Sequence, residues 1–447
     1  MKKNTHTISI LGLGYVGLCT AAVFAAKGIR TTGIDVDREK ASQIAAGKPP
    51  FHEPGLAQLL KTALRRKRLN ITNDTTTLEK TDITFLTVGT PSQPDGSIDL
   101  SQVEKASRTL GSLLSDKAAY HLVVVKSTVI PGTTTSKVKP ILERESSKTI
   151  GKSLGLVSNP EFLKEGTAIQ DTLSPDKLVI GAADKKSQST LLQLYRRLYG
   201  KKQPPTILTT PETAEMIKYA SNSFLATKIS YINTIANICQ HIPGVDVEKI
   251  AEAIGHDPRI GPLFLKAGPG YGGSCFHKDL QALISYSLTQ DYDPTLLRAT
   301  EQVNEQQASR VVDLAEKLLG NLHDKRIAVL GLAFKSNTDD IREEASIRVI
   351  DHLQKKGAHV VAYDPMAVPN ARKLLADTVE FSAEPRAAMR GADCCIVMTE
   401  WDEFRRLKEK DFMAQMKLPN LVDARKIYDP TSFKGSNFAA IGLGRSS

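Results

Sequence analysis

The stretch "TISILGLGYVGLCTAAVFAAKG", residues 7–28, decides the fold of the first part of the chain. An apolar run typical of a buried strand leads into a glycine turn, and a helix of small residues follows. Gly12, Gly14 and Gly17 have the spacing GxGxxG, which permits a tight turn, close approach of a pyrophosphate and close packing of helix on strand. The stretch therefore predicts a strand–turn–helix unit that holds a dinucleotide at the helix N-terminus.

A second strand, "RTTGIDVD" at residues 30–37, carries Asp35 near its end. A carboxylate at this position would bind the adenosine ribose hydroxyls and repel a 2′-phosphate, which favours NAD over NADP. The alternative is a glycine-rich turn that binds nothing. Further strands at 81–91 and 121–129 each end in small polar residues, at the sheet edge where open α/β sheets bind their ligands.

A second α/β pattern begins near residue 325. "KRIAVLGLAFK" (325–335) is a strand that runs into Gly331, and "AHVVAYDP" (358–365) is a strand that ends in Asp364. "GADCCIVMTEW" (391–401) resembles "KTDITFLTVGTP" (80–91) in layout. The phosphate-binding glycines are missing after Gly331, so this unit is expected to bind something other than a dinucleotide.

Between the two patterns, "PETAEMIKYASNSFLATKISYINTIANIC" (211–239) has the apolar spacing of a long helix. Lys218 and Asn222 are four residues apart and share a face of it. A central helix of this length would also be a natural dimer surface. The predicted fold class is α/β, with two Rossmann-like doubly wound domains joined by this helix.

Composition narrows the function classes. The chain of 447 residues is 41% hydrophobic and 24% charged, as in globular proteins, and its net charge of +10 suits anionic ligands. Five cysteines without CxxC spacing argue against disulfides or a metal site and for a reducing cytoplasm. No apolar run is long enough for a membrane span, and no signal peptide is expected.

The basic run "LRRKRL" (64–69) lacks aromatic residues, so a solvated helix face is expected there and not a nucleic-acid site. Three of the cysteines are expected in the core: Cys19, Cys394 and Cys395.

The loop "GPGYGGSCFHKD" (268–279) surrounds Cys275 with glycines that would give a substrate access to the thiol. A thiolate can attack an aldehyde and form a thiohemiacetal, which becomes a thioester after loss of a hydride and is then hydrolysed to an acid. Lys278 could favour the thiolate form, and Asp279 could act as a base or orient water. The alternative is a small hydrophobic residue packed beneath a glycine turn.

A further polar loop, "LVSNPEFLKEGTA" (156–168), follows an apolar strand. Its carboxylates Glu161 and Glu165 are candidate acid–base groups at a strand end. The alternative is a loop of solvated charges.

Seven motifs in order along nearly the whole chain resemble the family of UDP-sugar and GDP-mannose dehydrogenases: "GLGYVGL", "VGTPSQPDGSIDLS", "KSTVIPGTT", "NPEFLKEGTA", "EMIKYASNSFLATKISYIN", "RIGPLFLKAGPGYGGSCFHKDL" and "GLAFKSNTDDIRE". The resemblance implies three domains. Residues 1–205 would bind NAD, residues 206–305 would form a helical dimerisation domain with the cysteine loop, and residues 306–447 would bind UDP. His277 departs from the pattern, because many relatives have proline there.

The resemblance also implies residue roles. Cys275 would be the nucleophile. Lys218, Asn222 and Asp279 would stabilise the oxyanion and orient water, Glu161 would serve as acid–base in thioester hydrolysis, and Thr128 would help hold water. The implied cofactor contacts are Gly12, Gly14, Tyr15, Val16, Gly17, Asp35, Lys40, Thr90, Thr128, Glu165, Lys278 and Arg342. The implied substrate contacts are Glu161, Phe162, Leu163, Lys164, Glu165, Lys218, Asn222, Phe264, Leu265, Lys266, Ala267, Gly268, Gly272, Lys335 and Arg259, the last reaching the partner subunit's site.

The reaction that the resemblance implies is a four-electron, NAD-dependent oxidation of UDP-glucose to UDP-glucuronate by a homodimer or larger homo-oligomer. Relatives that oxidise UDP-N-acetylhexosamines have a sequence like "SPER" in place of "NPEF", and tend to have histidine where this chain has Ser274. UDP-glucose is therefore favoured over those sugars and over GDP-mannose. A non-catalytic NAD-binding regulator is a different alternative, but it would be expected to have lost Cys275, Lys218 or Asp279.

Overall fold

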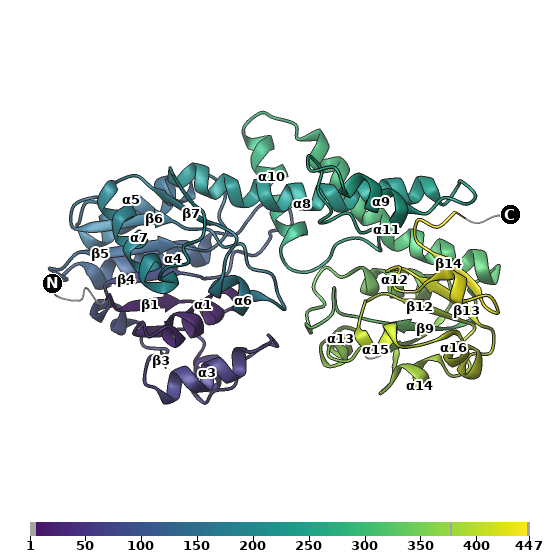
Figure 1. Ribbon diagram of the computed structural model, residues 1–447. Helices are drawn as coiled ribbons and strands as arrows, with labels where there is room; N and C mark the ends of the chain where they lie inside the picture. Colours follow the sequence, from purple (N-terminus) through teal and green to yellow (C-terminus); the bar gives the residue numbers. More distant parts are fainter. Residues whose placement is uncertain (1–5, 376–377, 445–447) are drawn as a thin grey trace. The chain divides into compact units, whose positions relative to one another are not determined.

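The computed structural model describes residues 6–375 and 378–444 (Figure 1). The chain forms two compact units, and the boundary in sequence falls between Ser221 and Asn222. Each unit is built around one sheet of its own, with helices on both faces of that sheet.

The first unit contains an eight-stranded sheet in the order β3-β2-β1-β4-β5-β6-β7-β8. Neighbouring strands are parallel except for β6 and β7, which are antiparallel. The strands are β1 (Ile8–Leu11), β2 (Thr31–Ile34), β3 (Leu69–Thr72), β4 (Ile83–Leu86), β5 (His121–Val125), β6 (Leu154–Ser158), β7 (Leu178–Ala182) and β8 (Thr206–Thr209). The helices are α1 (Tyr15–Ala26), α2 (Arg38–Ala45), α3 (Leu56–Arg65), η1 (Thr75–Lys80), α4 (Ser101–Leu114), η2 (Thr134–Val138), α5 (Lys139–Ser146), α6 (Ala168–Leu173) and α7 (Lys185–Tyr199).

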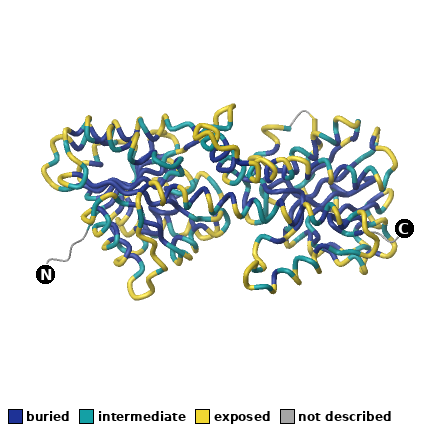
Figure 2. The backbone as a smooth tube through the Cα atoms, turned by 90° about the horizontal axis from the view of Figure 1, so that it is seen from above, coloured by how far each residue is buried: buried dark blue, intermediate teal, exposed yellow. Residues whose placement is uncertain are grey.

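The central strands of this sheet are buried along their whole length, as the dark segments of Figure 2 show. Their sequences, ISIL in β1, ITFL in β4 and HLVVV in β5, are nearly continuous apolar runs. Helices on both faces leave no solvated side for polar residues, so the alternation of a half-exposed strand is absent. The ligand edge of the sheet is therefore left to the loops after the strands.

The second unit contains a six-stranded, fully parallel sheet in the order β11-β10-β9-β12-β13-β14. The strands are β9 (Arg326–Leu330), β10 (His359–Tyr363), β11 (Glu380–Phe381), β12 (Cys394–Val397), β13 (Asn420–Asp423) and β14 (Asn437–Ala440). The helices are α9 (Val247–Gly255), α10 (Phe276–Thr289), α11 (Thr295–Leu319), α12 (Ala345–Lys355), α13 (Val368–Leu375), α14 (Pro385–Met389), α15 (Asp402–Arg405), α16 (Glu409–Gln415) and η3 (Pro430–Ser432).

The two α/β sequence patterns are similar in element order, and the two units share the same hydrogen bond in the turn after their first strand. In the first unit the Leu13 backbone N–H donates to the Asp35 carboxylate at 2.8 Å. In the second unit the Leu332 backbone N–H donates to the Asp364 carboxylate at 2.8 Å. The strand order around the first strand is also the same, so the prediction of two Rossmann-like doubly wound units is confirmed.

The predicted long helix is confirmed as α8 (Pro211–Cys239), which begins in the first unit and ends in the second. Phe224, Tyr231 and Ile238 are 65%, 54% and 52% exposed. They recur every seven residues, so they share one face of the helix. This apolar face is solvent-exposed in the single chain.

The expectation for "LRRKRL" (64–69) is only partly right. Arg65, Arg66, Lys67 and Arg68 are exposed, but α3 ends at Arg65. The chain turns there through Lys67, whose φ is 52°, and enters β3. The run is therefore a solvated turn and not a helix face.

Three cysteines were expected in the core, and that expectation is confirmed. Cys19 on α1 and the adjacent Cys394 and Cys395 on β12 are fully buried. Across residues 6–375 and 378–444, no helix is long and apolar enough to cross a membrane. No cluster of three or more histidine, cysteine or acidic side chains in these ranges could hold a metal ion.

Candidate active site

The glycine loop between β1 and α1 has the backbone form that a bound phosphate needs. Gly12 has a φ of +97°, and a Cβ there would lie 2.9 Å from the backbone of Thr87. A Cβ on Gly17 would lie 1.9 Å from the Gly12 carbonyl oxygen. Gly14, by contrast, faces open space and begins α1 without a side-chain cap. The loop thus leaves room and unpaired helix N–H groups for a pyrophosphate, so it fits a dinucleotide.

Asp35 lies directly after β2 beside this loop. Its buried carboxylate accepts from Leu13 and forms an ion pair with Lys40 of α2 at 2.6 Å. Two predicted cofactor contacts, Asp35 and Lys40, are therefore brought together at the end of β2. The Asp35 carboxylate thus lies beside the loop that would hold the pyrophosphate, where it can reach the adenosine ribose of a dinucleotide.

Tyr15, on the first turn of α1, has a partner that the sequence did not reveal. Its hydroxyl donates to the buried carboxylate of Glu53, and the Gly166 backbone N–H donates to the same carboxylate at 2.7 Å. The Tyr15 ring also packs on Phe51, with centroids 4.6 Å apart. Glu53 thus ties the start of α1 to the loop after β6. An acidic residue in "FHEPG" offers no motif that would have predicted this.

Glu161, in the loop after β6, forms a buried ion pair with Lys218 of α8. The Lys218 Nζ lies 2.9 Å from the Glu161 Oε1, and the side chains are 5% and 7% exposed. The Leu163 backbone N–H donates to the other carboxylate oxygen at 2.5 Å. Burial by itself would raise the pKa of Glu161, but the Lys218 ammonium and these hydrogen bonds outweigh it and lower the pKa. Glu161 is therefore an ionised carboxylate inside the protein.

Lys126, the residue directly after β5, is a second buried cation near Glu161. Its Nζ lies 3.5 Å from the Asn159 side-chain oxygen. The same oxygen also accepts a hydrogen bond from the Tyr195 hydroxyl, and the Asn159 side-chain nitrogen donates to the Val179 carbonyl oxygen at 2.8 Å. Burial lowers the pKa of Lys126 to about 8, against the opposing pull of Glu161. The sequence does not single out this residue as part of a site, because a lysine at the end of an apolar strand is usually solvated.

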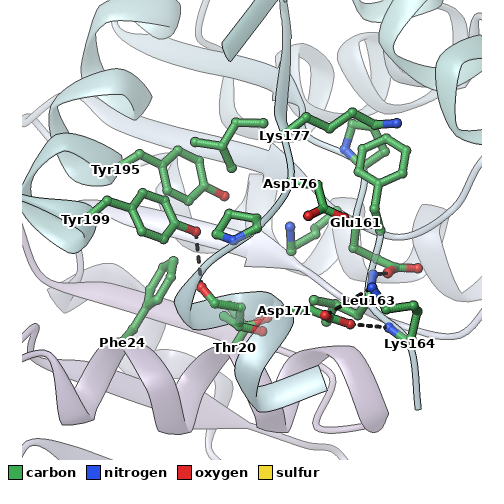
Figure 3. Close-up of a pocket in the computed structure, with 16 residues that line it drawn as sticks. Thr20, Phe24, Glu161, Leu163, Lys164, Asp171, Asp176, Lys177, Tyr195 and Tyr199 are labelled. Carbon is green, nitrogen blue, oxygen red and sulfur yellow. Dashed lines mark hydrogen bonds and ion pairs between the residues drawn. The ribbon is translucent and has the colours of Figure 1, made fainter. Parts of the chain in front are cut away.

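A small cavity of about 90 Å³ opens beside Glu161 and Lys126 in the first unit (Figure 3). Phe24, Tyr195 and Tyr199 line it from the other side. The volume exceeds what a single water molecule needs, and carboxylate, ammonium and hydroxyl groups offer it partners. The cavity can therefore hold water next to the buried carboxylate.

Cys275 lies at the N-terminus of α10 with its side chain exposed. The Asp279 backbone N–H donates to the Cys275 carbonyl oxygen at 2.9 Å, which closes the first helical turn. The Ser274 hydroxyl lies 3.5 Å from the Cys275 sulfur. The thiol is thus presented to solvent, and the alternative of a cysteine packed beneath a glycine turn is wrong.

The buried carboxylate of Asp279 is held from two sides. Asn222 of α8 donates to one oxygen at 2.6 Å, and the Lys278 ammonium lies 2.6 Å from the other. Asp279 is 1% exposed. Lys278, the candidate promoter of the Cys275 thiolate, thus forms an ion pair with Asp279. Lys218 and Asn222 are one turn apart on α8, so this helix contributes one residue to each buried carboxylate.

Three comparisons bear on the family. Models of the UDP-glucose/GDP-mannose dehydrogenase family match residues 6–199 (NAD binding domain), 212–306 (central domain) and 328–430 (UDP binding domain). The chain is 45% identical to a UDP-glucose 6-dehydrogenase of Haloferax volcanii, over 94% of this chain and 96% of that protein. It is 41% identical to a UDP-glucose 6-dehydrogenase of Rhizobium meliloti, over 97% and 99%.

The chain belongs to the UDP-glucose/GDP-mannose dehydrogenase family. A solved UDP-glucose dehydrogenase from Pyrobaculum islandicum has the same fold, with a TM-score of 0.91, 38% identity and coverage of 99% of this chain and 100% of that one. Membership confirms the resemblance found in the sequence, and the NAD-binding match together with the glycine loop confirms NAD as the cofactor.

The remaining residues that the family resemblance implied fall into two sets, one in each unit. In the first unit, Thr90 is buried, and Val16, Thr128 and Glu165 are half-buried. The ammonium groups of Lys177 and Lys218 lie 4.4 Å and 5.6 Å from the Phe162 ring centroid. Lys164 instead pairs with Asp171 at 3.2 Å and is largely exposed.

In the second unit of this dehydrogenase, the segment 264–268 is held by its own side chains and by its neighbours. Leu265, Ala267 and Gly268 are buried, and the Gly268 backbone N–H donates to Asn233 of α8 at 2.8 Å. Phe264 has a left-handed φ of 65°, and Lys266 pairs with Glu400 at 2.6 Å.

Three other predicted contacts lie in loops of the same unit. Lys335 is half-buried, with its ammonium 5.1 Å from the Phe334 ring centroid. Arg342 is exposed and pairs with Asp340 at 2.7 Å. Arg259 is 87% exposed at its side chain and pairs with Asp257 of its own loop at 2.6 Å.

The glycines before the thiol are required by close packing. A Cβ on Gly272 would lie 2.3 Å from the Glu344 carboxylate and 2.9 Å from the Glu343 carbonyl oxygen. The Gly273 backbone N–H donates to the Arg342 carbonyl oxygen at 2.8 Å. The loop before Cys275 is thus pressed against the segment that precedes α12, and a side chain at Gly272 would displace it.

Proposed function

We propose that this dehydrogenase oxidises UDP-glucose to UDP-glucuronate, consuming two NAD and one water per substrate. The relatives and the solved structure described above, all at 38% identity or more, carry the name of this activity. Solved N-acetylhexosamine dehydrogenases of the same fold are less similar, at 25% to 28% identity, and a solved GDP-mannose dehydrogenase is 32% identical. UDP-glucose is therefore favoured over the UDP-N-acetylhexosamine and GDP-mannose alternatives.

The single observation that carries the proposal is the exposed thiol of Cys275 beside the buried Asp279 carboxylate. A reaction that stops at the aldehyde needs no nucleophile, whereas oxidation to the acid requires a covalent adduct that can be oxidised again. The non-catalytic alternative leaves the exposed thiol, the Asn222–Asp279–Lys278 group and the Glu161–Lys218 pair unexplained.

The residues that would hold NAD are the glycine loop, with Gly12 and Gly14 at the pyrophosphate, and Asp35 at the adenosine ribose. NAD, when bound, supplies the hydride acceptor for each oxidation of the substrate C6. The uncapped N-terminus of α1 offers backbone N–H groups to the diphosphate. Asp35, paired with Lys40, disfavours the extra phosphate of NADP.

We assign the covalent steps to Cys275. Its thiolate attacks the aldehyde carbon, a C–S bond forms, and the carbonyl oxygen becomes an alkoxide of a thiohemiacetal. Lys218 and Asn222 are the candidate donors to this oxygen, because an ammonium and an amide stabilise negative charge that develops there. After the second oxidation the adduct is a thioester, which holds the acyl group until water attacks.

We assign the hydrolytic proton transfer to Glu161. Its lowered pKa keeps it ionised near neutral pH, as a general base must be. In the proposed step, a water molecule gives a proton to this carboxylate as its oxygen attacks the thioester carbon. The C–S bond then breaks, and Cys275 leaves as the thiolate ready for another turnover. Thr128 would help to hold the water, and Lys126 and Lys218 would stabilise the carboxylate.

The three-domain division at residues 1–205, 206–305 and 306–447 also belongs to the proposal. The absence of a phosphate-binding glycine set after Gly331 supports a ligand other than a dinucleotide for the last domain, and Lys335 in the following loop is the candidate contact for the UDP diphosphate. We further propose a homodimer or larger homo-oligomer. The exposed face of α8 (Phe224, Tyr231 and Ile238) is the candidate interface, and Arg259 would reach the neighbouring site.

A direct assay tests the proposed function. The purified protein is incubated with NAD and a panel of UDP- and GDP-sugars, NADH is followed by absorbance, and products are identified by mass spectrometry. We expect UDP-glucose to give two NADH and one UDP-glucuronate, without released aldehyde. Preference for another nucleotide sugar, or no NADH with any of them, would contradict the proposal.

A further inference from the structure

His277 lies on the first turn of α10, two residues after Cys275, and it faces a buried carboxylate. Its Nδ1 forms an ion pair with Glu301 of α11. The other Glu301 oxygen accepts from the Tyr271 hydroxyl at 2.9 Å. The Glu301 side chain is 4% exposed, whereas that of His277 is 25% exposed. One buried carboxylate thus holds a residue before the thiol and a residue after it.

Tyr271 is fixed to α11 by its backbone as well. Its N–H donates to the Asn304 side-chain oxygen at 2.7 Å, and the Asn304 amide donates back to the Tyr271 carbonyl oxygen at 3.1 Å. The Tyr271 ring packs edge-on against Phe276, with centroids 5.9 Å apart. The loop before Cys275 is therefore anchored on α11 at Tyr271, and His277 anchors the first turn of α10 to the same helix.

We propose that His277 and Glu301 form a charged clamp that positions the Cys275 turn, and that His277 is a positioning residue of this enzyme. The role in turnover rests on the function proposed above. The clamp holds the first turn of α10, and that turn sets where Cys275 and Asp279 lie. Backbone N–H groups of a helix N-terminus favour a thiolate only while the turn is closed around it.

The groups that face His277 come from three elements. Glu301 lies on α11, Glu343 lies in the segment before α12, and Arg348 lies on α12. The hydrogen bond to Glu301 and the charges of both carboxylates outweigh burial and Arg348, so the pKa of His277 is raised. The charged clamp is therefore complete at low pH. It weakens as the pH rises through the raised pKa of His277 and the imidazolium loses its proton.

Three variants test the clamp, with one matched control. His277→Ala removes it, and His277→Asn keeps a neutral donor near the position of Nδ1. Glu301→Gln removes the negative partner. The control is His323→Asn, because His323 is also paired with a carboxylate, that of Asp324, but its side chain is 73% exposed. Each variant is compared with the wild-type full-length enzyme.

The first measurement needs no substrate. Alkylation of Cys275 by iodoacetamide is followed by peptide mass spectrometry across pH. We expect the midpoint of the profile to move to higher pH in His277→Ala by about one unit, as an open first turn stabilises the thiolate less. His277→Asn should lie between His277→Ala and wild type. In parallel, NMR of enzyme with ¹³C-labelled histidines should show a raised pKa for His277 that falls in Glu301→Gln.

The second measurement is turnover. We expect kcat with UDP-glucose to fall about tenfold in His277→Ala, the factor expected for loss of one charge-assisted hydrogen bond, with KM for NAD unchanged. The pH profile of kcat in His277→Asn should lack the decline that accompanies loss of the His277 proton. A clamp that only aids folding would change the melting temperature but not these profiles.

Identical alkylation profiles for His277→Ala, His277→Asn and His323→Asn would overturn the clamp. If Glu301→Gln does not fold, the two His277 variants decide the matter. Altered alkylation profiles in an enzyme that makes no UDP-glucuronate would uphold the clamp while contradicting the proposed function, so the two failures are distinguishable.

Discussion

The Nζ of Lys218 lies 2.9 Å from the Oε1 of Glu161, although 57 residues separate them in the chain and both side chains are nearly inaccessible to solvent. A buried ion pair is poor support for stability, because desolvation consumes most of its Coulombic energy. The ion pair matters instead for the protonation state of Glu161. Lys218 keeps Glu161 ionised in a buried site, where an isolated carboxylate would be protonated more readily.

Glu161→Gln should therefore slow the release of product. The amide cannot accept the proton of the attacking water, so hydrolysis should fall by about 10²- to 10⁴-fold, the usual contribution of a general base. A thioester should then accumulate on Cys275. Intact-protein mass spectrometry after mixing with UDP-glucose and NAD checks this. The control Glu79→Gln, at an exposed position, should show no adduct. Release of product by Glu161→Gln at the wild-type rate would show that this carboxylate is not the general base of hydrolysis.

Lys126→Met should stabilise the protein near neutral pH while impairing turnover. Burial lowers the pKa of Lys126 to about 8, so below that pH the charged lysine destabilises the folded state. The shift from the ordinary value corresponds to about 3 kcal/mol at most. As the pH rises from 8 toward 10.5, the ordinary pKa of lysine, Lys126 loses its proton in the folded state and this destabilisation decreases. Above pH 10.5 it is absent. The advantage of Lys126→Met in thermal melts should thus be largest at pH 7 and vanish near pH 10.5. A constant advantage across pH would show that Lys126 is not titrating.

The fold and part of the site could be predicted from sequence, for identifiable reasons. The spacing of Gly12, Gly14 and Gly17 requires a backbone form that few other turns share, and the structure has it. The apolar period of 211–239 extends over enough residues to identify α8. Both signals are local, and local signals can be read from one chain.

The missed features depend on partners that are distant in sequence. Lys126 meets Glu161 only because β5 and β6 are neighbours in the sheet, and nothing in "VVVKSTV" marks its burial. Glu53 and the Glu301–His277 clamp are pairs of the same kind. The end of α3 within the basic run at 64–69 cannot be predicted from charge, because charge alone does not mark where a helix ends.

Asp35→Asn should weaken the preference for NAD. The asparagine keeps an oxygen for the Leu13 N–H but no longer repels a 2′-phosphate, and Lys40 loses its anionic partner. We expect the ratio of kcat/KM for NAD over NADP to fall by about ten- to a hundredfold. Steady-state kinetics with both cofactors measures it. Glu39→Gln, at an exposed position on α2 next to Lys40, is the control and should leave the ratio unaltered. An unchanged ratio in Asp35→Asn would place the discrimination elsewhere.

The exposed face of α8 should be an interface in solution. A glutamate at Phe224 or Tyr231 would place a charge in a buried apolar contact, so Phe224→Glu with Tyr231→Glu should reduce the mass measured by light scattering to that of one chain. Leu374→Glu on α13 is the control, since Leu374 is 66% exposed, close to Phe224 at 65%. A wild-type protein that is monomeric and fully active would contradict the proposed assembly, and so would a double variant that remains associated.

The most direct test of the central claim is product analysis of Cys275→Ala with saturating NAD and UDP-glucose. The thiol lies outside the glycine loop and outside the Glu161–Lys218 pair, so binding of NAD and UDP-glucose, measured by calorimetry, should be nearly intact. Formation of UDP-glucuronate should be almost abolished, because without the thiolate no thiohemiacetal or thioester can form. UDP-glucuronate formed by Cys275→Ala at close to the wild-type rate would contradict covalent catalysis by this residue.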